Sequence, residues 1–223
     1  MSTVNDPVTP LVVAVEGLSF AGKTTLVHAL ASVPGAIALP EYSELAPLPP
    51  FPPRDRCDVA KALEHFLSLE HHRARTAPAA GHPVVVLDRS PLTLISYEIG
   101  IAELGVPTDP ELAVRLYSDA VDTGLVLAPH GYLYLRVPDA VTAARQACRG
   151  QVAAHLADPR VRTGIERANL QYLTTLPARR WLDLDGTRPV DQLTADVAAF
   201  VEQLAQLPGP APTWRVITDT EPA

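Results

Sequence analysis

The chain has 223 residues, a length that favours one globular domain over two complete ones. Its 25 acidic residues outnumber its 18 basic ones, and the resulting charge of −7 argues against a broad nucleic-acid-binding face. Hydrophobic residues make up 47%, enough for a sizeable core, while no apolar run reaches the ~20 residues of a membrane span. The opening residues lack a signal-peptide pattern, and the two cysteines form no CxxC pair. We therefore expect a cytoplasmic protein without membrane or nucleic-acid partners.

Short apolar runs alternate with helical patterns along the chain. The runs are rich in Val, Ile, Leu or aromatic residues, which is typical of strands buried on both faces. The expected strands cover residues 11–16, 36–41, 83–88, 131–137 and 179–185. The expected helices cover residues 24–32, 55–77, a stretch from 110, 139–149, 160–176 and 190–207. This alternation predicts an α/β fold with a parallel sheet.

Two stretches break the alternation. Residues 46–53 read APLPPFPP, which predicts an ordered but irregular loop, because proline stiffens the chain and offers no ladder donors. From Pro208 onward we expect a loose tail, in which Trp214, Val216 and Ile217 are candidates for an edge strand. The sequence thus divides into a main domain, residues 1–207, and a C-terminal tail, residues 208–223.

A phosphate-binding loop follows the first expected strand. Residues 17–24 read GLSFAGKT and match G-x-x-x-x-G-K-[ST], with a strand before them and a helix after them. Such a loop points backbone N–H groups at phosphate oxygens, and the helix adds the positive end of its dipole. Lys23 can reach the β- and γ-phosphates, and the Thr24 hydroxyl can bind Mg²⁺. The predicted ATP-binding residues are Gly17, Ser19, Ala21, Gly22, Lys23, Thr24 and Thr25.

The third strand separates the classes of protein that use this loop. A motor ATPase usually ends that strand with an Asp-Glu pair, whereas this chain has Asp88-Arg89-Ser90, and it contains no N-K-x-D guanine-binding motif. An arginine there can neutralise a moving phosphoryl group or hold an acceptor. A purely structural alternative makes Asp88 a helix cap and Arg89 half of a surface ion pair. The pattern favours phosphoryl transfer to a bound acceptor.

Several of these segments together resemble the thymidylate kinase and deoxynucleoside kinase group. The segments are EGLSFAGKTT, LPE, VVVLDRSPLT and APHGYLYLRVPDAVTAARQACRG, and the resemblance covers roughly residues 11–205. It implies a P-loop NTPase fold, a three-layer α/β/α arrangement with a five-stranded parallel sheet and an arginine-bearing lid at about 145–165. It also implies a kinase that transfers the ATP γ-phosphate to a nucleoside or a nucleoside monophosphate, and it allows a homodimer.

The resemblance gives roles to four residues near the acceptor. Glu41 in the LPE segment would be the general base on the acceptor hydroxyl, since a carboxylate there can take the proton as the new P–O bond forms. Arg89 would steady this base and the acceptor, and Asp88 would be the acidic partner of the metal together with Thr24. Arg73 would contact the substrate, with Arg75 as the alternative.

Other residues are assigned to the lid and the donor site. Arg145 and Arg149 stand four residues apart on one expected helix face, so both guanidinium groups can point at the same phosphates. The resemblance makes them catalytic lid arginines. Arg160 and Arg162 would extend the lid or bound its hinge. Residues 185–187, Asp-Gly-Thr, would pack against the donor adenine.

The acceptor region departs from the group's pattern. Residues 40–53 contain neither glycine nor arginine, which counts against a monophosphate acceptor, and His65 or Phe66 stands where a base-reading glutamine is expected. The proline-rich loop could instead form a wall for a non-nucleoside alcohol, such as an antibiotic or secondary metabolite. Three functions therefore stay open: a nucleoside or nucleotide kinase, a kinase of such an alcohol, and a non-catalytic nucleotide-dependent binder or switch.

Overall fold

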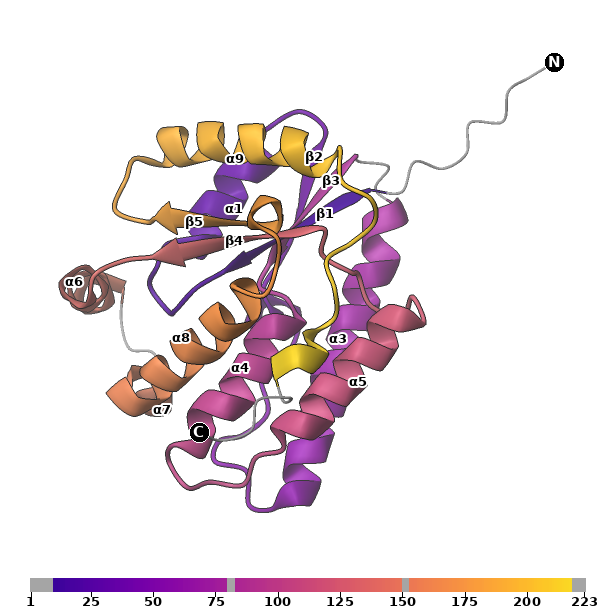
Figure 1. Ribbon diagram of the computed structural model, residues 1–223. Helices are drawn as coiled ribbons and strands as arrows, with labels where there is room; N and C mark the ends of the chain where they lie inside the picture. The colour runs from indigo at the N-terminus through magenta and orange to yellow at the C-terminus, as the bar shows by residue number, and fades with distance from the viewer. Residues whose placement is uncertain (1–9, 80–82, 150–152, 218–223) are drawn as a thin grey trace.

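The computed structural model describes residues 10–79, 83–149 and 153–217 (Figure 1). It contains one five-stranded sheet in the order β2-β3-β1-β4-β5, and every neighbouring pair is parallel. The strands are β1 (Leu11–Glu16), β2 (Ala36–Leu39), β3 (Val84–Asp88), β4 (Gly131–Arg136) and β5 (Trp181–Asp185). The predicted α/β fold with a five-stranded parallel sheet is confirmed.

Helices cover both faces of the sheet and make three layers (Figure 1). One face carries α1 (Lys23–Ala31) and α9 (Val190–Leu204); the other carries α3 (Arg56–Ala79), α4 (Pro91–Ala102), α5 (Pro110–Asp122) and α8 (Pro159–Leu173). The remaining helical segments are α2 (Tyr42–Leu45), α6 (Asp139–Arg149), α7 (Ala154–Ala157) and the 3₁₀ turns η1 (Ala178–Arg180) and η2 (Trp214–Ile217). No helix within the described ranges is long and apolar enough to cross a membrane.

The continuously apolar sequence of the central strand β1 follows from its burial on both faces. Val13 and Val15 pack into the core under α1 and α9, whereas Val12 and Ala14 pack into the core under α3, α4, α5 and α8. Because helices cover both faces of the sheet, neither face of this strand is open to water, and the sequence shows no alternation of apolar and polar residues. The order β2-β3-β1 also brings the carboxyl ends of three neighbouring strands together, and the segments after parallel strands form the usual ligand site of such a sheet.

Helix α4 is the main element that the sequence pattern did not predict. Ser90 caps it by accepting a hydrogen bond from the Leu92 N–H at 3.2 Å, and Pro91 stands in its first turn. Eight of its residues are buried, so the helix lies between α5, α8 and the cavity described below and shows no polar face. An amphipathic stripe, the usual helical signal, is therefore missing. The Ser-Pro start was the signal that could have revealed it.

The described part of the C-terminal tail is docked and forms no strand. Trp214 is 1% exposed, and its indole N–H donates to the Tyr132 hydroxyl at 3.2 Å. Arg180 fixes the approach to this point by donating to the carbonyls of Pro208 and Gly209 at 2.7 and 2.6 Å. The sequence predicted a loose tail or an edge strand, and residues 208–217 form neither. The segment is docked because the Trp214 indole is buried in an apolar site that also supplies an acceptor for its N–H. Residues 218–223 lie outside the described residues.

Candidate active site

The phosphate loop runs from the end of β1 into α1 with three residues in the left-handed region. Their φ angles are 135° at Gly17, 64° at Phe20 and 105° at Gly22. A Cβ atom on Gly17 would lie 2.4 Å from the carbonyl oxygen of Leu135 on the neighbouring strand β4. Glycine is thus required at this position both for its backbone angle and for the close contact between loop and strand.

Lys23 is buried at the start of α1. The residue is 5% exposed, and its ammonium group donates a hydrogen bond to the Leu18 carbonyl of the same loop at 2.9 Å. Burial, and then the positive charge of Arg89, lower the pKa of Lys23 to about 7. An anionic ligand in the loop would reverse this effect, since an opposite charge favours the protonated amine.

Thr24 and Asp88 form a candidate magnesium site. The Thr24 hydroxyl donates to Asp88 Oδ2 at 2.7 Å, while Asp88 Oδ1 is buried and has no hydrogen-bond partner among the described residues. An unpartnered buried carboxylate oxygen beside a hydroxyl suits a hard cation, and Mg²⁺ usually takes one or two protein oxygens and completes its shell with waters and phosphates. The described residues contain no cluster of three or more His, Cys, Asp or Glu able to hold a metal ion.

Glu41 and Arg89 lie together beside the phosphate loop. Arg89 Nε donates to Glu41 Oε1 at 2.7 Å, and Arg89 itself has a φ of 68°, a left-handed angle that is uncommon for a non-glycine residue. Burial acts to raise the pKa of Glu41, but the charges of Arg89 and Lys23 outweigh it and hold this pKa below its usual value. Glu41 is therefore ionised at neutral pH, the state in which a carboxylate can accept a proton.

Glu16 joins the phosphate loop to α4 and was not identified from the sequence. It is the last residue of β1, is fully buried, and accepts hydrogen bonds from the Ser90 N–H at 2.9 Å, the Ser90 hydroxyl at 2.6 Å and the Thr93 hydroxyl. Burial raises its pKa. A carboxylate that ends an apolar strand directly before a glycine was the available signal, because such a group needs buried donors nearby.

The structure does not support the predicted contact of Arg73 with substrate. Arg73 is 1% exposed and is absent from the cavity wall. Its guanidinium group donates to Glu70 at 2.9 Å and to the carbonyls of Asp88 and Arg89 at 3.3 and 2.9 Å. These acceptors partly offset the burial of this arginine, whose Nε has no partner among the described residues, and the contacts hold the turn that carries Asp88 and Arg89. The alternative, Arg75, is exposed.

Arg145 reaches from α6 to the back of the phosphate loop. Its guanidinium group donates to the carbonyls of Phe20 and Ala21 at 3.1 and 2.8 Å and to the Gly186 carbonyl at 2.7 Å. The loop after β5 packs closely against the phosphate loop, since a Cβ atom on Gly186 would lie 2.8 Å from the Ala21 carbonyl oxygen. Arg145 thereby joins the two segments predicted to surround the donor nucleotide.

The other predicted lid arginines are more scattered. Arg149 is the last residue of α6, and its side chain lies outside the described residues. Arg160 pairs with Asp158 at 2.9 Å and is largely exposed, whereas Arg162 donates to Asp139 at 2.7 Å and lines the cavity. Of the remaining loop residues, Ser19 lines the cavity, Ala21 is buried and Thr25 is exposed.

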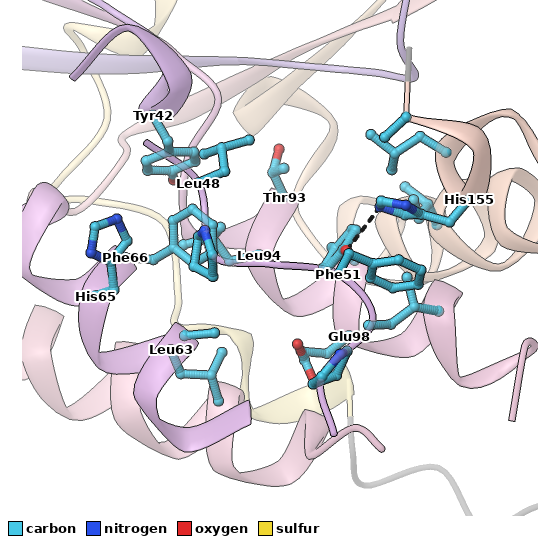
Figure 2. Close-up of a pocket in the computed structure, with 18 of the residues that line it drawn as sticks. Tyr42, Leu48, Phe51, Leu63, His65, Phe66, Thr93, Leu94, Glu98 and His155 are labelled. Carbon is cyan, nitrogen blue, oxygen red and sulfur yellow. Dashed lines mark hydrogen bonds between the residues drawn. The ribbon is translucent and has the colours of Figure 1, made fainter. Parts of the chain in front are cut away.

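A cavity of about 760 Å³ opens next to the phosphate loop (Figure 2). Gly17, Ser19, Glu41 and Arg89 line one part of it, so the predicted donor loop and the predicted base face one continuous space. Apolar residues from three directions line much of the rest. They are Pro47, Leu48, Pro49, Pro50, Phe51 and Pro53 of the proline-rich loop, Val59, Leu63 and Phe66 of α3, and Leu94 and Ile101 of α4.

The proline-rich loop contacts the segment between α6 and α8 through one histidine. The rings of Phe51 and His155 stack with centroids 3.6 Å apart and planes 20° from parallel. The Tyr97 hydroxyl and His155 Nε2 form a hydrogen bond of 3.0 Å, which Figure 2 draws as a dashed line. These three side chains come from the loop, α7 and α4, and together they close one side of the cavity. Their spatial meeting has no local sequence signal.

Polar groups are few on the wall away from the phosphate loop. His65, which stands near the place of the expected glutamine, lines the cavity, and its Nε2 is buried without a partner among the described residues. Asn169 of α8 and Glu98 of α4 also line this part.

Comparisons with known proteins rest on structure alone. No known protein-family profile matches the chain, and no curated protein matches its sequence. A deoxyadenosine kinase from M. mycoides, solved with the products dCMP and dCDP, superposes with a TM-score of 0.62 at 17% identity, over 86% of this chain and 99% of that one. A thymidylate kinase from Candida albicans superposes with a TM-score of 0.64 at 13% identity, over 92% of this chain and 97% of that one. The resemblance predicted from the motifs is thus confirmed at the level of the fold: the chain has the P-loop α/β fold of deoxynucleoside and thymidylate kinases.

Proposed function

We propose that the chain is a kinase that transfers the γ-phosphate of ATP to a hydroxyl group of a nucleoside. The observation that carries this proposal is the shared cavity, in which the phosphate loop and the Glu41–Arg89 pair face one space of about 760 Å³. A nucleotide-dependent switch needs the loop but has no use for an ionised carboxylate beside an enclosed second site. Phosphoryl transfer needs both, because donor and acceptor must lie in line.

Seven polar or charged residues of the site have a place in this reaction. Lys23 and the loop amides would hold the donor phosphates, and Thr24 with Asp88 would hold Mg²⁺, which neutralises charge on the phosphates when bound. Glu41 would accept the proton of the attacking hydroxyl, and Arg89 keeps this carboxylate ionised and in position. Arg145 and Arg149 lie on α6, from which Arg145 reaches the loop carbonyls, and both would stabilise the negative charge of the transition state.

The charges of the cavity wall favour a nucleoside over a monophosphate. Each arginine that lines the cavity already has a carboxylate partner: Arg54 with Asp58, Arg89 with Glu41 and Arg162 with Asp139. The proline-rich loop between Glu41 and Arg54 carries no cation. A phosphate on the acceptor would therefore meet no unpaired arginine on the described wall, whose further cation, Lys61, is exposed on α3, whereas a neutral acceptor needs none.

The test is Mg²⁺-ATP turnover with deoxynucleosides, ribonucleosides, their monophosphates and hydroxylated antibiotics as acceptors. We expect ADP release that depends on a nucleoside. Glu41→Gln should lower kcat by about 10²–10⁴-fold, the usual contribution of a general base, with little change in protein stability. Glu44→Gln is the matched control, since Glu44 lies one turn along α2 and is exposed.

Three results would redirect the proposal. Turnover with monophosphates alone would mean that the wall rearranges to bind a second phosphate. Turnover with an antibiotic alone would favour the kinase of a metabolite alcohol, which the apolar proline-rich wall also suits. ATP binding without turnover of any acceptor, together with a partner that binds only the ATP-loaded form, would make the chain a binder.

A further inference from the structure

Glu98 is an acidic side chain in the largely apolar acceptor region of the cavity (Figure 2). It stands on α4, seven residues after Pro91, and Pro91 directly follows the Asp88-Arg89-Ser90 turn. A helix rises 1.5 Å per residue, so Glu98 lies about 10 Å along α4 from the start of the helix, where Arg89 holds Glu41. One helix thus carries the predicted reaction centre at its start and a carboxyl group two turns away.

Only one of the two Glu98 oxygens is used within the described structure. Oε2 accepts a hydrogen bond from the Asp109 N–H at 3.0 Å, at the N-terminus of α5, and no hydrogen bond among the described residues ends at Oε1. This bond fixes the orientation of the carboxyl group. Because Glu98 lines the cavity, Oε1 is the oxygen left for a ligand.

The surroundings of Glu98 make an unpaired oxygen costly. The residue is 5% exposed, and none of the ion pairs among the described residues includes it. Burial raises the pKa of Glu98 to about 7, although the hydrogen bond from the Asp109 backbone acts in the opposite direction. A carboxyl group in such a place needs a hydrogen-bond donor, and none on the described wall is bonded to Oε1.

We propose that Glu98 determines acceptor specificity by accepting, at Oε1, an N–H donor on the end of the acceptor opposite its reactive hydroxyl. The inference rests on the proposed nucleoside kinase function and deepens it. The exocyclic amino group of an adenine or cytosine base is a donor of this kind, whereas the keto oxygen of hypoxanthine or uracil places an acceptor against the carboxylate. Two acceptors that face each other without a proton between them repel and lose their water partners.

A glutamine at position 98 should reverse this preference. The Asp109 N–H still needs an acceptor, so the carbonyl oxygen of the new amide takes the place of Oε2 and its NH₂ group faces the cavity. Glu98→Gln therefore replaces an acceptor by a donor at nearly constant volume. The donor fits a keto base and conflicts with an amino base.

The experiment compares acceptors that differ only in this group: deoxycytidine with deoxyuridine, and deoxyadenosine with deoxyinosine. At pH 8, we measure kcat/KM with Mg²⁺-ATP and, separately, equilibrium binding of the four nucleosides without ATP. The wild-type chain should favour each amino member by about 10–100-fold, the range expected when a buried polar group is left unpaired by the analogue. Glu98→Gln should lower this ratio below one. Glu103→Gln, an exposed change at the end of the same helix, should leave the ratio at its wild-type value.

The two readouts separate the specificity proposal from the proposed function. Turnover of amino and keto members at equal rates, or an unchanged ratio in Glu98→Gln, overturns the role of Glu98 and leaves the kinase function standing. Selective binding of the amino members without any turnover supports the role of Glu98 and overturns the kinase function. The absence of both binding and turnover overturns both.

Discussion

The proposed donor side and the proposed acceptor side of the cavity are built in different ways. The donor side is one short segment, residues 17–24, whose backbone is set by local angles and by contact with β4. The acceptor side is assembled from the proline-rich loop, α3, α4, α7 and α8, which meet only in the folded chain. Phosphate binding requires several backbone N–H donors that point to one place, whereas acceptor binding requires a cavity whose side chains match the shape of the acceptor. The two halves can therefore vary independently.

The two sides meet at the turn formed by Asp88 and Arg89. Asp88 bonds to Thr24 on the donor side, and Arg89 bonds to Glu41 on the acceptor side. Arg73 supports both through their carbonyl groups from behind the cavity. The comparison therefore predicts that changes at this junction affect the whole fold, while changes on either side affect one function.

The largest effect on stability is expected from Arg73→Met. The substitution leaves the Glu70 carboxylate fully buried, with the Tyr42 hydroxyl as its one remaining partner among the described residues. It also removes a donor from the buried Asp88 carbonyl and the partly buried Arg89 carbonyl. Breaking a buried ion pair in this way costs about 3–5 kcal/mol of the free energy of unfolding. Chemical denaturation of both proteins measures this difference.

Two controls sharpen this prediction. Arg75→Met changes an exposed residue on the same helix and should alter stability by less than about 0.5 kcal/mol. The double variant Glu70→Gln/Arg73→Met removes the unpaired charge and should be more stable than Arg73→Met alone. A loss below about 1 kcal/mol for Arg73→Met would show that the junction does not depend on this arginine.

The next effect is confined to the donor side. Lys23→Ala should lower kcat by at least about 10²–10³-fold, because a positioned charge at the transferring phosphate is lost. Arg115→Ala on the exposed face of α5 is the control and should leave kcat unchanged. The free energy of unfolding of Lys23→Ala should not fall, because burial of the charged ammonium group, which lowers its pKa to about 7, destabilises the folded wild-type chain.

The same lysine predicts a proton uptake. Without ligand at pH 8, a group whose pKa is about 7 is mostly neutral, whereas phosphates beside it restore the protonated form. Binding of ATP should therefore take up about one proton at pH 8. Calorimetry in buffers of different ionisation enthalpy measures this uptake, which Lys23→Ala should abolish. Binding without uptake in the wild-type chain would mean that Lys23 is already charged.

The contrast between the two sides also explains what the sequence could predict. Residues 17–24 and Asp88-Arg89 are short local patterns, and their meeting follows from the strand order, so the contact of Thr24 with Asp88 and the Glu41–Arg89 pair could be anticipated. Helix α4 could not, because it is buried nearly all round. The contact of Phe51 with His155 joins residues about 100 positions apart and depends on loops without periodicity.

Arg73 shows the limit of a helical pattern. The apolar stripe of α3 correctly indicated a buried arginine that needs acceptors, and the acceptors that it contacts are Glu70 and two backbone carbonyls. Sequence spacing predicts the face of a helix on which a residue lies, not the partner that it meets there.

On the acceptor side, Glu98→Gln should change how stability depends on pH. The folded chain raises the pKa of Glu98 from 4.5 to about 7, so between these values the folded state binds more protons than the unfolded state. The contribution of protonated Glu98 to the stability of the folded state is fully present below pH 4.5 and is lost as the pH rises through 7. At pH 8, Glu98→Gln should be more stable than the wild-type chain by up to about 3 kcal/mol, and at pH 4.5 the two should be equal. Urea denaturation at both pH values measures this; equal stabilities at pH 8 would mean that Glu98 titrates normally.

The smallest effect is expected from Phe51→Ala, which removes the ring that stacks on His155. Such a contact contributes about 0.5–1.5 kcal/mol, so acceptor KM should rise by about 2–10-fold while kcat and ATP binding stay unchanged. Leu125→Ala, which changes an exposed leucine away from the cavity wall, is the control for a simple loss of apolar area. If Phe51→Ala instead weakens ATP binding as much as acceptor binding, the contact between the proline-rich loop and α7 couples the two sides. The donor and acceptor halves would then act as one unit, despite their separate construction.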